Sequence, residues 1–147
     1  MSLKISVGSD HAGFELKSTI ITWLSENGVD LVIDYGTGSN EPVDYPDIAH
    51  AVVNCLLDGD TDLSILICGS ANGMCMTANK WRDTRAALCW LPEIAKLARL
   101  HNNANVLCLP ARFITEHDAI EIVKIFIETE FEGGRHKTRI NKINPNF

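Results

Sequence analysis

Four short segments of this chain combine polar side chains with glycine or asparagine, and each could bind an anion or move a proton. The first, 8–14, places Asp10 and His11 between an apolar run and a helical pattern. It lacks both the lysine of a Walker phosphate loop and the GxGxxG spacing of a dinucleotide loop. An Asp-His pair at a helix N-terminus suits an anion or a hydroxyl-rich ligand. A purely structural alternative is that Asp10 caps the helix and His11 is merely exposed.

The second segment, 68–73, reads Cys-Gly-Ser-Ala-Asn-Gly and follows the most apolar run of the chain. Two glycines among small residues let several backbone N–H groups converge, an arrangement that can hold a developing oxyanion. Beside such dipoles the pKa of the Cys68 thiol, ordinarily ~8.5, can fall enough for the thiolate to act as a base or nucleophile. The alternative is a buried structural cysteine that precedes a glycine turn.

The other two segments supply an imidazole and a pair of guanidinium groups. His101 continues the apolar stripe of a predicted helix but has polar neighbours, so both a core histidine and a proton-transfer histidine are consistent with it. Arg135 and Arg139 lie on one face if their segment is helical, and together they could grip a phosphate. The alternative is that this basic run is solvated surface.

Composition limits what these segments can belong to. The chain has 147 residues, 46% of them hydrophobic, and a net charge of −6, which fits one domain and argues against binding of nucleic acid or an anionic membrane. We expect a cytoplasmic protein, because neither a signal pattern nor a membrane-spanning run is present. Five cysteines without CxxC spacing indicate neither a disulfide framework nor a zinc site. We expect Cys68 to be the most reactive of them and the others to be structural, namely Cys55, Cys75, Cys89 and Cys108.

Short apolar runs alternate with helical patterns along the whole chain. We predict strands at 3–7, 31–33, 63–68, 85–90 and 105–109, and helices at 14–27, 47–57, 73–80, 116–130 and from 92 onwards. This alternation is typical of an α/β protein with a five-stranded parallel sheet covered on both faces, a three-layer α/β/α sandwich. Ligands of such sheets bind beyond the carboxyl ends of the strands. The strand-to-helix loops are therefore the expected site.

Six stretches in order give the chain a resemblance to the ribose-5-phosphate isomerase type B family, which includes the galactose-6-phosphate isomerase subunits. The likeness runs from about Lys4 to Ile143. The stretches are Gly8-Ser9-Asp10-His11-Ala12-Gly13-Phe14-Glu15-Leu16-Lys17, Asp44-Tyr45-Pro46-Asp47, Ile67-Cys68-Gly69-Ser70, Ala78-Asn79-Lys80, His101-Asn102-Asn103-Ala104-Asn105-Val106-Leu107 and Phe131-Glu132-Gly133-Gly134-Arg135-His136.

The resemblance implies a single Rossmann-like domain over 1–147 that isomerises an aldose phosphate to a ketose phosphate without a cofactor or metal. Ribose 5-phosphate is the expected substrate, with galactose 6-phosphate, allose 6-phosphate or a tetrose phosphate as alternatives. A more distant alternative is a non-catalytic phosphate- or nucleotide-binding module on a flavodoxin-like sheet. The resemblance further implies a homodimer, or a dimer of dimers, whose active sites are built from both chains, and a tail from about 137 that packs on the partner.

The resemblance also assigns roles to individual residues. It implies that Cys68 removes the proton from the sugar carbon, that Ser70 and the rest of the loop 69–73 hold the enediolate oxygens, that His101 assists ring opening, and that Asp10 is a binding position. Ring opening needs one proton given and one taken, so the chemistry offers Asp10 as a partner of His101. Substrate-binding positions by the same resemblance are His11, Tyr45, Gly69, Ala71, Asn72, Gly73, Asn102, Arg112, Arg135 and Arg139.

The chain departs from the family pattern at three positions, and a fourth position indicates to which branch of the family it is similar. Ser70 and Ala71 replace the usual threonine and second glycine, so Ala71 brings a β-carbon to a turn that needs an unusual backbone conformation. Pro110 replaces a glycine before Arg112, a change that could shift this arginine. Met74 stands where one branch has a glutamate base, which places the chain in the cysteine branch.

Overall fold

A parallel sheet of five strands forms the centre of the protein. The computed structural model describes residues 2–146. The strands are β1 (Lys4–Ser9), β2 (Leu31–Asp34), β3 (Leu63–Cys68), β4 (Ala86–Leu88) and β5 (Val106–Pro110), in the order β2-β1-β3-β5-β4. All six residues of β3 are buried, as expected for a strand with a neighbour on each side and helices above and below. The predicted fold class is confirmed.

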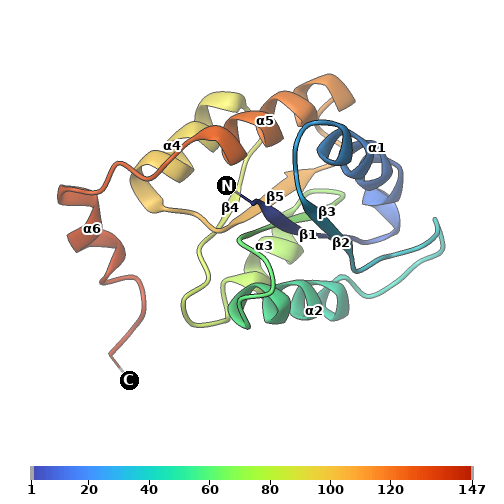
Figure 1. Cartoon of the computed structure of the whole chain (residues 1–147). Coiled ribbons are helices and arrows are strands. Elements are labelled where there is room, and N and C mark those ends of the chain that lie inside the picture. The colour runs from blue at the N-terminus through green and yellow to red at the C-terminus, as the bar shows by residue number, and fades with distance from the viewer. Residues whose placement is uncertain (1, 147) are drawn as a thin grey trace.

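Helices cover both faces of the sheet (Figure 1). One face carries α1 (Phe14–Glu26), α4 (Pro92–Asn102) and α5 (Glu116–Glu128), and the other carries α2 (Tyr45–Leu57) and α3 (Asn72–Ala78). Each face has its own apolar core: Ile20, Phe126 and their neighbours fill the first, and Val52, Met74 and theirs fill the second. A 3-10 turn, η1 (His11–Gly13), leads from β1 into α1. No helix among the described residues is long and apolar enough to cross a membrane.

The direction of the strands divides the molecule into two ends. Cys68 ends β3 opposite Pro110, the last residue of β5, and Asp10 follows β1 at the same edge. α4 runs antiparallel to the strands, back to the end of the sheet where the strands begin. Asn105, between α4 and β5, marks this end, because its carbonyl accepts from the Ser64 amide near the start of β3. The C-terminus of α4 therefore lies at the opposite edge of the sheet from Cys68. α6 (Arg135–Ile140) contacts α4 and stands apart from the sheet, at the left of Figure 1.

The fourth strand is shorter than the sequence predicts. The expected strand at 85–90 is reduced to Ala86–Leu88, an edge strand that pairs only with β5. The Asn79 side chain accepts from the Ala86 amide at 2.8 Å and donates to its carbonyl at 2.9 Å, and so occupies the free edge there. The other strands and helices begin and end within two residues of their predicted bounds.

The end of the chain is held against the loop before β4. Arg82 donates to the Pro145 carbonyl at 3.0 Å, the Asp83 amide donates to the Asn144 side chain at 3.2 Å, and the Asn144 amide group donates back to the Asp83 carboxylate at 2.6 Å. These bonds form within one chain. Packing of the tail from about 137 on a partner subunit stays a prediction.

Candidate active site

A pocket of about 850 Å³ opens at the carboxyl edge of the sheet, between the ends of β1 and β3. The helices that follow these two strands, α1 and α3, lie on opposite faces, and in open α/β sheets a crevice forms where the helices change face. Eight of the residues predicted for the site line this pocket: Asp10, His11, Tyr45, Cys68, Gly69, Ser70, Gly73 and Arg112. The structure thus brings together side chains that lie up to about a hundred positions apart in the sequence.

The Cys68 thiol lines this pocket, and its surroundings act on its pKa in opposite directions. Only 5% of the residue is exposed, and its burial raises the pKa of the thiol, as does the negative charge of Asp10. Backbone N–H groups of Met74, Ala71 and Ser70 hydrogen-bond to the sulfur and act in the other direction. The net direction is upward. The expectation of a lowered pKa is therefore wrong for the single chain, because burial outweighs the loop dipoles that the sequence suggested.

The loop 69–73 takes the conformation expected from its unusual residue. Ala71 has φ 65° and ψ −7°, a left-handed geometry that is rare for a residue with a β-carbon. Its side chain is fully buried, and its amide is one of the three that reach the sulfur. The Asn72 amide donates to Ser70 Oγ at 3.3 Å and closes the turn. The prediction that Ala71 occupies a strained position is confirmed.

Close packing at two glycines fixes the walls of the pocket. A β-carbon at Gly73 would lie 2.0 Å from Cε1 of Tyr45, so the aromatic ring covers this glycine directly. A β-carbon at Gly69 would lie 3.1 Å from a guanidinium nitrogen of Arg112, whose backbone amide donates to the Gly69 carbonyl at 3.1 Å. Arg112 therefore lies over the loop and lines the pocket, with Pro110 in the place of the family's glycine.

The first segment serves structure and site at the same time. The Asp10 carboxylate caps η1 by accepting from the Gly13 amide at 3.2 Å, and it also lines the pocket. His11 Nδ1 accepts from the Val43 amide at 3.4 Å, which leaves Nε2 available to a ligand. The capping role of Asp10 is confirmed, and ligand binding by this segment stays a prediction.

Of the other predicted residues, Ala71 and Asn72 lie in the loop and at the start of α3 beside Cys68. The last four lie at the opposite end of the molecule. His101 and Asn102 end α4. The segment with Arg135 and Arg139 is helical, as α6, so these two arginines lie one turn apart on one face. Cys68 and His101 of one chain consequently belong to opposite ends of the molecule. A single chain does not assemble the predicted site.

Two residues without an assigned role accompany His101. The rings of His101 and His136 stack with centroids 4.2 Å apart and planes 15° apart, and Nε2 of each lies 3.8 Å from one carboxylate oxygen of Glu132. We call His101, Glu132 and His136 the histidine cluster. Their ligand atoms are close enough together for one metal ion. However, the lone pairs of two nearly parallel rings do not converge on a common point, so the geometry favours stacking and proton sharing over chelation.

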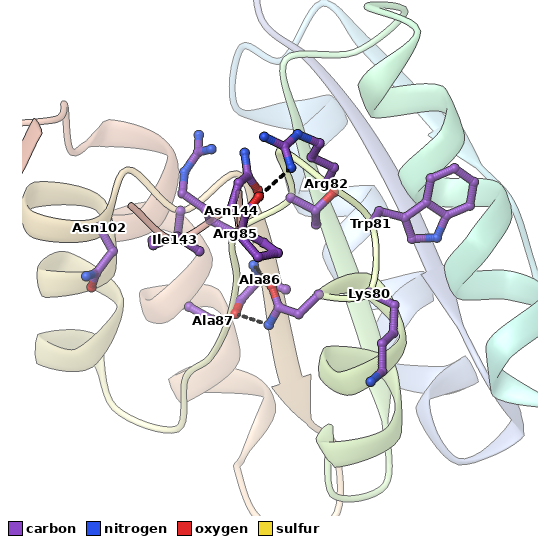
Figure 2. Close-up of a pocket in the computed structure, with 13 residues that line it drawn as sticks. Lys80, Trp81, Arg82, Arg85, Ala86, Ala87, Asn102, Ile143 and Asn144 are labelled. Carbon is purple, nitrogen blue, oxygen red and sulfur yellow. Dashed lines mark hydrogen bonds between the residues drawn. The ribbon is translucent and has the colours of Figure 1, made fainter. Parts of the chain in front are cut away.

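A second pocket, of about 790 Å³, lies near this end of the molecule (Figure 2). It lies between the loop before β4 and the tail, with Asn102 on α4 also in its wall. Figure 2 shows the Arg82 side chain reaching the tail through the hydrogen bond described above. Apart from Asn102, sequence reasoning predicted none of this lining.

The other cysteines differ from the expectation in one respect. Burial raises the pKa of Cys89 to about 12. A hydrogen bond with Cys75, together with burial, raises the pKa of Cys108 well above its usual range. In contrast, the pKa of the partly exposed Cys75 is lowered, chiefly by a hydrogen bond from Cys108. In the single chain Cys75, and not Cys68, therefore has the more acidic thiol.

The fold and the pocket define the class: a parallel α/β protein whose small-molecule site lies at the carboxyl edge of its sheet. The chain belongs to the ribose/galactose isomerase family, whose model matches residues 5–143. It is 46% identical over 147 residues to a probable ribose-5-phosphate isomerase B of Mycoplasma genitalium, with 97% of this chain and 95% of that protein covered. It is 43% identical over 140 residues to ribose-5-phosphate isomerase B of Escherichia coli, with 95% of this chain and 93% of that protein covered.

Solved structures agree with this assignment. A ribose 5-phosphate isomerase of Thermotoga maritima superposes with a TM-score of 0.94 at 50% identity, with 97% of this chain and 98% of that chain covered. The Mycoplasma genitalium ribose-5-phosphate isomerase B, solved with bound ribulose 5-phosphate, gives a TM-score of 0.91 at 46% identity, with 97% of this chain and 95% of that chain covered. The predicted family is confirmed.

Proposed function

We propose that this protein interconverts ribose 5-phosphate and ribulose 5-phosphate through an enediolate. Its family and its relatives make it a sugar-phosphate aldose–ketose isomerase. The observation that carries the choice of substrate is the relative solved with ribulose 5-phosphate, which matches nearly the whole chain. The pocket beyond Cys68 provides the matching cavity.

Cys68 is the proposed base of the proton transfer. Its thiolate takes the proton from C2 of the open-chain aldose and returns it to C1, and the electrons of the C–H bond pass through the enediolate. The hydroxyl proton on O2 is transferred to O1 in the same interconversion, so that C2 becomes the carbonyl and C1 the hydroxyl carbon. Negative charge moves from the sulfur to the substrate oxygens, close to the N–H groups of Ser70, Ala71 and Met74. Removal of one such donor costs about 3–4 kcal/mol of transition-state stabilisation in other enzymes. The raised pKa of the thiol makes the thiolate a stronger base once it forms.

A second copy of the chain is proposed to complete each site. Cys68 and His101 lie at opposite ends of one chain, and a twofold arrangement would bring the His101 end of one copy to the Cys68 end of the other. Large apolar side chains are exposed on α3, after β4 and beside the pocket: Met76 at 66%, Trp90 at 49% and Phe113 at 73%. Exposed apolar side chains of this size, on the elements around the edge strand and the pocket, support a subunit interface there.

The second copy would supply the groups for ring opening and phosphate binding. His101 gives a proton to the ring oxygen as the bond from that oxygen to C1 breaks. The anomeric hydroxyl becomes the carbonyl and loses its proton, for which Asp10 in the pocket is the proposed acceptor. Arg135 and Arg139 bind the phosphate through paired N–H donors. They provide a local positive field in a chain of net charge −6.

An assay over a panel of sugar phosphates in the presence of a chelator tests this proposal. We expect turnover of ribose 5-phosphate to exceed that of galactose 6-phosphate, allose 6-phosphate and erythrose 4-phosphate. Cys68→Ala should abolish turnover and keep substrate binding, whereas the matched Cys55→Ala variant, altered far from the pocket, should keep both. Preference for another sugar of the panel would correct the substrate. Binding without any turnover by the unaltered protein would favour the non-catalytic phosphate-binding module.

A further inference from the structure

The histidine cluster contains a buried imidazole that the proposed mechanism does not use. Only 5% of His136 is exposed, whereas the side chain of its stacked partner His101 is 37% exposed. His136 Nε2 is buried and has no hydrogen-bond partner among the described residues. The Glu132 carboxylate lies 3.8 Å from this nitrogen, beyond hydrogen-bond distance. Burial of an unpaired imidazole nitrogen is costly, so this arrangement needs an explanation other than stability.

Stacking makes His136 a rigid support for His101. The two rings are almost parallel at 4.2 Å, and His136 lies at the start of α6, after the link that carries Glu132. The Glu132 amide donates to the Leu100 carbonyl at 3.1 Å, which ties this link to the end of α4 beside His101. The partly exposed His101 ring is thus held from its own chain by a buried ring and a carboxylate.

The charges around the pair favour one proton on one ring. Glu132 faces both imidazoles and attracts a proton, while Arg135 and Arg139 of α6 repel one from His136. Burial and the neighbouring His101 lower the pKa of His136. Two protonated rings stacked at this distance would repel each other. These influences disfavour a proton on the buried His136 ring, which leaves the more exposed ring of the pair as the one from which a sugar can receive a proton.

We propose that His136 and Glu132 are positioning residues for ring opening, which hold His101 in place and direct the proton of the pair onto it. This inference rests on the proposed function and adds to it the origin of the acid. His136 itself touches no substrate in this account. In the balanced step His101 gives its proton to the ring oxygen, the bond from that oxygen to C1 breaks, and the hydroxyl proton of C1 leaves to the acceptor.

The test compares a substrate that must be opened with one that cannot close. Ribose 5-phosphate forms a ring through its 4-hydroxyl, and 4-deoxyribose 5-phosphate lacks this hydroxyl, so only the first depends on ring opening. The variants are His136→Ala, which removes the stack, His136→Phe, which keeps a ring without nitrogens, and Lys137→Ala as a control on the exposed side of α6. Thermal unfolding establishes that each variant is folded.

We expect His136→Ala to lower kcat/KM for ribose 5-phosphate at least tenfold and to change the open-chain analogue less than about twofold. His136→Phe should restore ribose 5-phosphate turnover to within about threefold, and Lys137→Ala should resemble the unaltered protein. Equal losses on both substrates, no loss on ribose 5-phosphate, or a folded Phe variant as poor as the Ala variant would overturn the proposal.

Titration of the histidines by NMR gives a readout that needs no activity. In the unaltered protein we expect the pKa of His136 to lie below its ordinary range, because burial and the neighbouring His101 lower it. His101→Ala should raise the His136 midpoint, and Glu132→Gln should lower it. A His136 midpoint at or above the ordinary range, or one that neither substitution moves, would overturn the proposal even if His136→Ala does not fold. Failure of the unaltered protein to turn over ribose 5-phosphate would instead refute the proposed function and leave this titration meaningful.

Discussion

Replacement of Gly73 by alanine should damage the active site through one specific contact. The new β-carbon would lie 2.0 Å from Cε1 and 2.5 Å from Cζ of Tyr45, whereas carbon atoms ordinarily approach to about 3.5 Å. The ring must therefore move by roughly 1.5 Å. Tyr45 is only half-buried and lines the pocket, so the ring can move, but it moves within the space of the substrate.

The free-energy cost follows from two opposing effects. Overpacking of this kind costs about 1–3 kcal/mol, and replacement of a helical glycine by alanine returns up to about 1 kcal/mol. We expect Gly73→Ala to lower the free energy of unfolding by about 1–2 kcal/mol in urea titrations and to reduce kcat/KM at least tenfold. Gly38→Ala is the control, because its β-carbon would meet no atom within 4 Å.

A double-mutant cycle identifies the contact. In a Tyr45→Ala background the clash is absent, so the same Gly73→Ala change should cost nothing or stabilise the protein slightly. An equal loss of stability with and without the Tyr45 ring would refute the reasoning, and the intolerance of Gly73 would then lie in its backbone.

Three further predictions concern the thiols, the arginines and the ion pair between the buried Lys17 and the half-exposed Asp34. Alkylation by iodoacetamide should label Cys75 first at neutral pH, and the rate of Cys68 alkylation should still rise above pH 9, because burial and Asp10 disfavour the Cys68 thiolate. Asp10→Asn should move the pH dependence of the Cys68 rate to lower pH, and a Cys68 rate that levels off below pH 8 would contradict this reasoning. Arg135→Lys or Arg139→Lys should lower kcat/KM for the phosphorylated sugar by an amount equivalent to about 1–3 kcal/mol and leave kcat/KM for the unphosphorylated sugar unchanged. Equal losses for the two sugars would mean that these arginines stabilise the fold. Asp34→Asn should destabilise the protein by about 1–3 kcal/mol in urea titrations, because it removes the counter-charge of the buried Lys17 ammonium, which lies 2.8 Å from both oxygens of the half-exposed Asp34 carboxylate. Lys17→Met should cost less, and the reverse order would refute the assignment.

The fold was predictable because each strand corresponds to a short apolar run that is recognisable in the local sequence. The run 63–68 is apolar throughout and forms the central strand, and the Pro at position 92 begins a helix as its fixed φ allows. The edge strand β4 was predicted too long, because its length depends on the Asn79 side chain, a contact between two elements that periodicity does not report. The strand order β2-β1-β3-β5-β4 likewise follows from tertiary packing.

The residues that line the pocket were predictable from the sequence, whereas the pKa of Cys68 and the packing around His101 were not. Glycines and polar side chains after β1 and β3 indicated the pocket, because parallel strands end at one edge. The direction of the Cys68 pKa was missed, since loop dipoles are visible in a sequence and burial of the sulfur is not. His136 stood within the stretch Gly133-Gly134-Arg135-His136 that carried the resemblance, but its stacking on His101 depends on how α6 returns to α4.

The central claim is that each active site uses Cys68 from one chain and His101 from another, and mixing two inactive variants tests it most directly. Cys68→Ala and His101→Ala homodimers each lack one required group at both sites. After co-refolding in equal amounts, about half of the dimers are mixed, and each mixed dimer has one site with both lesions and one intact site. We predict recovery of about a quarter of the activity of the unaltered protein, which follows from these proportions. A mixture that remains as inactive as its components, although size and mass measurements show mixed dimers, would contradict the claim.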